Sequence, residues 1–116
     1  MTRILHLSDL HFGLERTALI QPLLDLVNAS HADLVVVTGD LTHRGRSAQF
    51  AAAASFLRRI EAPLIAVPGN HDIPLYKLTE RILRPYRRYR NAVAKTLEPI
   101  GHVGDIRVQG VNSVDP

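Results

Sequence analysis

Three short polar segments, each following an apolar run, carry the side chains that could do chemistry. They are Asp9-Leu10-His11, Gly39-Asp40 and Gly69-Asn70-His71-Asp72. The intervals are 31 residues from Asp9 to Asp40 and 30 from Asp40 to Asn70, and each fits one strand–helix–strand crossover. If the three runs are neighbouring parallel strands, the polar residues meet at one edge of a sheet, where α/β proteins build their sites.

Two carboxylates, an imidazole and an amide oxygen at one edge would repel and desolvate one another unless a cation lay among them. Divalent metal ions resolve that conflict, and mixed oxygen and nitrogen ligands suit Mn²⁺, iron or Zn²⁺. Asp40 follows the middle run, so its carboxylate is placed to bridge two ions about 3.5–4 Å apart, the spacing that clamps a phosphoryl group. The chain has no cysteine, which excludes thiolate ligands and disulfides.

Alternating strand and helix patterns position these segments. Strands are predicted at the apolar runs 4–7, 34–37 and 64–67, and the β-branched run at 34–37 is the clearest. Apolar residues recur at helical spacing over 16–29 and 47–60. The apolar faces predicted for these helices are Leu19, Leu23, Leu26 and Val27 in the first and Phe50, Ala53, Ala54, Leu57 and Ile60 in the second. The order strand, helix, strand, helix, strand predicts an α/β fold with a parallel βαβαβ core.

The second half of the chain is less regular. Residues 75–97 are predicted to form a basic helical excursion interrupted at Pro85, and residues 106–111 alternate well enough for a further strand. His6 lies within the first strand and is predicted to be a core histidine whose polar atoms are satisfied. His102 is predicted to be a surface residue.

The composition is that of one globular domain, with 116 residues, 46% of them apolar and 22% charged. The net charge is +3, but the segment 77–95 alone holds seven basic residues and one acidic residue. This split predicts an acidic centre elsewhere and a basic segment that either forms a solvated helix face or attracts anions. No apolar run reaches the roughly 20 residues of a membrane span. The N-terminus is not expected to hold a signal peptide, so we expect a cytoplasmic protein without a membrane partner.

The three polar segments, in this order and at these strand ends, resemble the calcineurin-like metallophosphoesterases. Within that family, HLSDLHFG at residues 6–13 and GDLTHRG at residues 39–45 are most similar to the bacterial cyclic-nucleotide phosphodiesterase branch. Three motifs in register over 64 residues make a far more specific signal than any one of them.

The resemblance implies a role for each residue of the site. Asp9 and His11 would bind a first metal ion, Asp40 would bridge the two ions, and Asn70 would bind the second. His71 would not be a ligand; it would be the catalytic residue that contacts a phosphoryl oxygen or the leaving group. Asn70 and His71 would together bind the substrate.

The resemblance also implies a four-layer α/β/β/α sandwich, of which residues 1–116 would be a partial domain, its N-terminal half. The family pattern continues with a further histidine and a G-H-x-H pair that complete the metal shells. Nothing after Asp72 matches them, because Gly104 stands where the second histidine of Gly101-His102-Val103-Gly104 would be.

The activity implied is metal-dependent hydrolysis of phosphodiesters, with cyclic nucleotides favoured. The cofactors would be two divalent metal ions, Mn²⁺, Fe²⁺/Fe³⁺ or Zn²⁺. The expected partner is a small-molecule phosphate ester, and nucleic acid is a less favoured one.

Three alternatives compete with this hypothesis. Asp9 and Asp40 are residue types that cap helices, and residues 70–72 are typical of a turn. A truncated, non-catalytic chain would keep half a metal site and bind an anionic partner through the basic segment. A metal-free α/β interaction module is disfavoured, because it would have no use for this set of ligands together. His43, close behind Asp40, is a secondary candidate for substrate contact.

Overall fold

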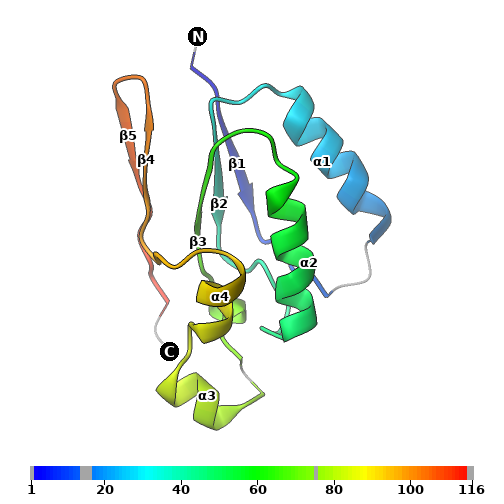
Figure 1. Ribbon diagram of the computed structural model, residues 1–116, viewed down its shortest axis with the longest axis vertical. Coiled ribbons are helices and arrows are strands. Elements are labelled where there is room, and N and C mark those ends of the chain that lie inside the picture. Colours follow the sequence, from blue (N-terminus) through cyan, green and yellow to red (C-terminus); the bar gives the residue numbers. More distant parts are fainter. Residues whose placement is uncertain (1, 14–16, 75, 115–116) are drawn as a thin grey trace.

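The computed structural model describes residues 2–13, 17–74 and 76–114. Its centre is a parallel three-stranded sheet in the order β1-β2-β3, built from β1 (Ile4–Ser8), β2 (Leu34–Thr38) and β3 (Leu64–Val67). The three strands run side by side with Leu7 opposite Val37 and Val37 opposite Ala66. The predicted βαβαβ core is therefore confirmed, and all three strands end at the same edge of the sheet (Figure 1).

Two helices cover one face of this sheet. A short 3-10 helix (Thr17–Leu19) leads into α1 (Ile20–Ala29), and α2 (Ser47–Arg58) connects β2 to β3. Figure 1 shows α1 and α2 on the same side of the strands. Val35 and Val37 of β2 point into this layer and are fully buried, because β-branched residues pack well on a pleated surface covered by helices. Phe50 and Phe56 of α2 complete the core.

The predicted apolar face of α1 is partly wrong. Val27 is buried as predicted, but Leu19 and Leu26 are 58% and 69% exposed, and Leu24 takes a core position instead. Helix α1 has apolar residues on more than one face, so the helical spacing alone does not determine which face is buried. Packing against the sheet decides this. The predicted face of α2, in contrast, is buried throughout.

His6 also differs from its prediction. Residues alternate across a strand, so His6 shares with Val36 and Ile65 the face that points away from α1 and α2. The ring is exposed rather than in the core, and its Nε2 atom lies 2.7 Å from the Thr38 hydroxyl oxygen. The prediction of a satisfied polar atom is confirmed, and the prediction of a core position is wrong.

Past β3 the chain forms the basic excursion and then a hairpin. The excursion holds α3 (Leu78–Leu83) and α4 (Arg87–Ala92), which Pro85 separates as predicted. The strand predicted at 106–111 is β5 (Ile106–Gln109). It pairs antiparallel with β4 (Ile100–Val103), a strand that the sequence pattern did not predict. His102 is exposed, as predicted.

The hairpin β4–β5 lies on the side of the sheet opposite α1 and α2 (Figure 1). The side chains of Leu34 and Ile65 bound the space beside Gly101 of β4, so the two sheets approach closely there. This mixed α/β arrangement is consistent with the predicted fold class, while the four-layer sandwich stays a prediction. In the described part of the chain, no helix is both long enough and apolar enough to cross a membrane.

Candidate metal centre

The loops after β1 and β2 bring two carboxylates and one imidazole together. The His11 Nε2 atom lies 3.8 Å from Asp9 Oδ1 and 3.7 Å from Asp40 Oδ2. One ligand atom from each of the three residues lies within 4.8 Å of the other two. The convergence predicted from the strand ends is therefore present for these three residues.

An unusual backbone conformation turns these side chains to one point. Asp9, His11 and Asp40 all have positive φ angles, of 55°, 48° and 49°. Such angles are uncommon outside glycine, although Asp and His adopt them more readily than most residues. The two loops are also joined by backbone hydrogen bonds, from the Asp9 N–H to the Gly39 carbonyl and from the His11 N–H to the Asp40 carbonyl. Strained backbone of this kind clusters at functional sites, where the surrounding structure holds it in place.

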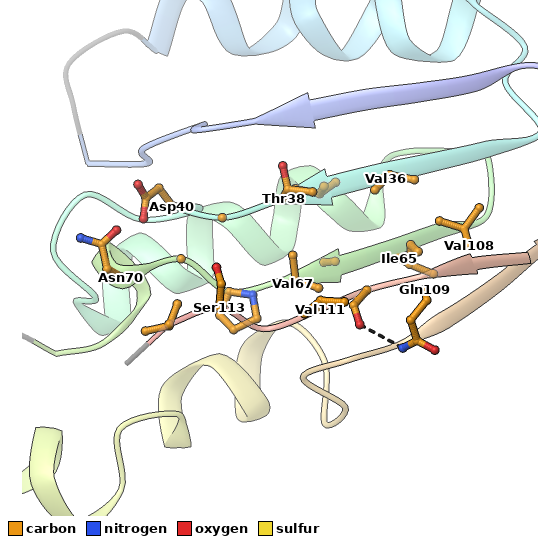
Figure 2. Close-up of a pocket in the computed structure, with 17 residues that line it drawn as sticks. Val36, Thr38, Asp40, Ile65, Val67, Asn70, Val108, Gln109, Val111 and Ser113 are labelled. Carbon is orange, nitrogen blue, oxygen red and sulfur yellow. Dashed lines mark hydrogen bonds between the residues drawn. The ribbon is translucent and has the colours of Figure 1, made fainter. Parts of the chain in front are cut away.

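The third polar segment approaches from the loop after β3. Asn70 and His71 belong to a 3-10 helix (Asn70–Asp72), and the His71 N–H donates to Asp40 Oδ1 at 3.0 Å. Asp40 and Asn70 both line an open cavity of about 580 Å³. Figure 2 shows them at one end of it, beyond the ends of β2 and β3. Asn70 is exposed there.

Gly69 permits this approach. A Cβ atom at Gly69 would lie 2.2 Å from the backbone nitrogen of Asp40 and 2.3 Å from its Oδ1 atom, far inside van der Waals contact. The φ angle of Gly69 is −110°, which any residue adopts. Glycine is therefore required here for space and not for conformation.

Asp72 locks the loops after β2 and β3 together. Its side chain is fully buried and accepts hydrogen bonds from the backbone N–H groups of Leu41, Thr42 and Gly69. Burial raises the pKa of Asp72, and the hydrogen bonds from Gly69, Thr42 and Leu41 work against that rise. No role was predicted for Asp72 from the sequence, although a carboxylate directly after two site residues was a signal for one.

His43 also belongs to the site. Its ring centroid lies 5.9 Å from that of His11 and 5.8 Å from that of His71, with the His71 ring nearly parallel to it. Its backbone carbonyl oxygen lies 2.6 Å from His71 Nδ1. Burial lowers the pKa of His43, and the neighbouring charges of Arg44, His71 and His11 lower it further, which favours a neutral imidazole.

The chemistry of this donor set fits a divalent cation. Asp9 and Asp40 form salt bridges only with His11 among the residues that the structure describes, so no Lys or Arg there neutralises the two carboxylates. The His11 Nδ1 atom is buried and has no hydrogen-bond partner within the same part of the chain. Carboxylate oxygens with an imidazole nitrogen suit Mn²⁺, iron and Zn²⁺.

A parallel α/β sheet whose strand ends carry carboxylates and imidazoles in this order defines a class of metal-binding proteins. Residues 2–113 match the calcineurin-like phosphoesterase family, and the chain belongs to it. The resemblance found from the three motifs is thereby confirmed.

Several curated proteins are similar to the chain over part of its length. A probable cyclic nucleotide phosphodiesterase of Rhodopseudomonas palustris is 36% identical over 76 residues, covering 57% of this chain and 28% of the relative. The glycerophosphodiester phosphodiesterase GpdQ of Enterobacter lignolyticus is 35% identical over 80 residues, covering 58% and 28%. A probable cyclic nucleotide phosphodiesterase of Vesicomyosocius okutanii is 28% identical over 76 residues, covering 60% and 33%. The aligned part of the chain thus spans a third or less of each of these relatives.

Proposed function

We propose that this chain is part of a metal-dependent phosphoesterase that hydrolyses phosphodiesters at a dinuclear centre. The observation that carries the proposal is the convergence of the Asp9, His11 and Asp40 ligand atoms at the ends of two parallel strands. Membership of the calcineurin-like phosphoesterase family supports the reaction class.

The proposed ligands divide between two ions. Asp9 and His11 hold the first ion, Asn70 holds the second, and Asp40 serves both. Two bound divalent ions would activate water and neutralise the charge that develops on the phosphoryl group. The hydrogen bond from the His71 N–H to Asp40 Oδ1 leaves Oδ2 of the same carboxylate facing His11, so the two oxygens of Asp40 already point in different directions.

His71 is proposed to contact the phosphoryl oxygen or the leaving group. Its Nδ1 atom is 2.6 Å from the His43 carbonyl, which can only accept a hydrogen bond. The Nδ1 atom therefore carries the proton, and Nε2 is left for the substrate. Its ring centroid is 5.1 Å from that of His11, a proposed ligand of the first ion, and this proximity supports a role in departure of the alcohol.

A phosphodiester is the proposed substrate class. Two of the similar proteins are named as probable cyclic nucleotide phosphodiesterases and a third as a glycerophosphodiester phosphodiesterase, and all three names specify a phosphodiester. Cyclic nucleotides are favoured, because the motifs at 6–13 and 39–45 are most similar to that branch. The basic segment 77–95 would then attract the anionic substrate from the rim of the site.

Calorimetric titration of Mn²⁺ into the 116-residue chain tests the proposal. Asp40→Asn is expected to weaken Mn²⁺ binding by at least about tenfold, because it replaces the one carboxylate proposed to serve both ions with a neutral amide. Asp105→Asn is the matched control, since Asp105 is exposed in the turn between β4 and β5 and lies outside the site.

Hydrolysis of bis-p-nitrophenyl phosphate is measured on the same variants. Turnover by this chain is expected to be slow, because each proposed ion has few ligands among Asp9, His11, Asp40 and Asn70. Equal Mn²⁺ affinity in the Asp40→Asn and Asp105→Asn variants would contradict the proposed centre and favour the alternative of a non-catalytic, anion-binding chain.

A further inference from the structure

One arginine of the basic segment behaves differently from its neighbours. The Arg88 side chain is only 10% exposed, whereas that of Arg87 is 50% exposed. Arg88 donates from Nε and Nη2 to the two carboxylate oxygens of Glu80, at 3.1 and 3.0 Å. It also donates from Nη1 to the hydroxyl of Tyr76 and, at 3.1 Å, to the carbonyl of Gly45. A guanidinium with three different partners is a structural crosslink and not a solvated charge.

The crosslink joins α3 and α4 to the loop at residues 42–46, which follows β2. Arg46 of the same loop stacks over the Tyr76 ring, with its guanidinium carbon 4.4 Å from the ring centroid. Gly45 itself fits tightly, because a Cβ atom there would lie 2.8 Å from the carbonyl oxygen of Ile73. Arg88 therefore holds the loop through the backbone carbonyl of Gly45.

This loop in turn orients His71. The Gly45 N–H donates to the Thr42 hydroxyl at 2.9 Å, and that hydroxyl lies 2.9 Å from the His71 carbonyl oxygen. His43 lies between Thr42 and Gly45 in the chain, and its carbonyl accepts the hydrogen bond from His71 Nδ1. A shift of Gly45 would displace the His43 carbonyl and weaken the bond that decides which ring nitrogen of His71 carries the proton.

We propose that Arg88 is a positioning residue for His71: by anchoring the Gly45 carbonyl, it holds the His43 carbonyl where it keeps His71 in the Nδ1–H tautomer with Nε2 free. The inference rests on the proposed function only in assigning the free Nε2 atom to contact with the substrate. The tautomer itself is a property of the chain without substrate or metal.

The test is the tautomer of His71 in the metal-free, ¹⁵N-labelled 116-residue chain at about pH 8, where imidazoles are neutral. Nitrogen chemical shifts from long-range ¹H–¹⁵N spectra distinguish Nδ1–H from Nε2–H. Arg88→Met keeps the apolar stem and removes all four hydrogen bonds to Glu80, Tyr76 and Gly45. We expect this variant to lower the ratio of Nδ1–H to Nε2–H roughly fivefold, the effect of losing one hydrogen bond of ordinary strength.

Arg87→Met is the matched control, because Arg87 also binds Glu80 but makes no bond to Gly45. It is expected to leave the tautomer ratio unchanged. Should Arg88→Met unfold the chain, Arg88→Lys serves the same comparison, since an ammonium cannot reproduce the forked contact with Glu80 and Gly45.

A folded Arg88 variant with the ratio of the natural chain would overturn the proposal, and so would a natural chain in which His71 is not Nδ1–H. Neither result depends on metal binding or hydrolysis. Failure of this inference is thus distinguishable from failure of the phosphoesterase proposal.

Discussion

Replacing Gly69 by alanine should damage both the fold and the metal centre for one steric reason. The added methyl group would lie 2.2 Å from the backbone nitrogen of Asp40, and ordinary contact begins at 3.4 Å. The loops after β2 and β3 must therefore separate by about 1.2 Å. Overpacking of this kind costs about 2–3 kcal/mol. No backbone strain adds to that figure, because alanine readily adopts a φ of −110°.

The same displacement should weaken metal binding. Ligands must be held within about 0.5 Å of their working positions, and the shift exceeds that tolerance. We expect Gly69→Ala to lower Mn²⁺ affinity by at least about tenfold. Urea denaturation followed by circular dichroism measures stability, and a loss of 2–3 kcal/mol should lower the midpoint by about 1–2 M.

Gly104→Ala is the informative control. Gly104 has a φ of +57° with no atom within 4 Å of an added Cβ, so alanine there meets strain without a clash. It should cost about 1–2 kcal/mol in stability and leave Mn²⁺ affinity unchanged. If Gly69→Ala stayed within about 0.5 kcal/mol of the natural chain and bound Mn²⁺ equally well, the close approach of the two loops would be refuted.

Two further predictions concern buried and paired carboxylates. Asp72→Asn should destabilise the chain by about 1–3 kcal/mol, as measured by thermal denaturation. Both carboxylate oxygens of Asp72 accept hydrogen bonds from backbone N–H groups, so in either orientation the new NH₂ group would face at least one donor. The same change at the exposed Asp105 should have no effect on stability. Hydrogen bonds from Arg87, and to a smaller extent from Arg88, lower the pKa of Glu80 below its ordinary value of 4.5. The stability that these bonds contribute is therefore present above about pH 4.5 and is lost as the pH falls through the pKa of Glu80 in the folded chain. Urea midpoints measured between neutral and acidic pH should therefore fall less steeply below pH 4.5 in Glu80→Gln than in the natural chain, and identical slopes would contradict the pairing.

The parallel core could be predicted because local patterns and packing agree there. The valine-rich run of β2 suits a buried strand, and the spacing of Asp9, Asp40 and Asn70 places them at successive strand ends. Because neighbouring parallel strands end at one edge of a sheet, this placement alone predicted that the ligand atoms of Asp9, His11 and Asp40 converge.

Other features depend on contacts that no local pattern reveals. Strand β4 contains Gly101 and His102, which weaken its apolar pattern, and it is stabilised by pairing with β5. The bond from Arg88 to Gly45 joins residues 43 positions apart. The sequence therefore predicted only a solvated or an anion-attracting basic segment and not this crosslink. His43 was only a secondary candidate, because the stacking of its ring on His71 depends on how two loops meet.

The position of a bound Mn²⁺ ion would show whether the three strand ends form one metal centre. Mn²⁺ added in small amounts to the ¹⁵N-labelled chain broadens the amide signals of residues close to it. We expect the amide signals of Asp9, His11, Asp40 and Asn70 to broaden first and together, while those near Asp105 stay sharp. Broadening centred on the hairpin turn, or at the end of only one of the three strands, would contradict a shared metal centre.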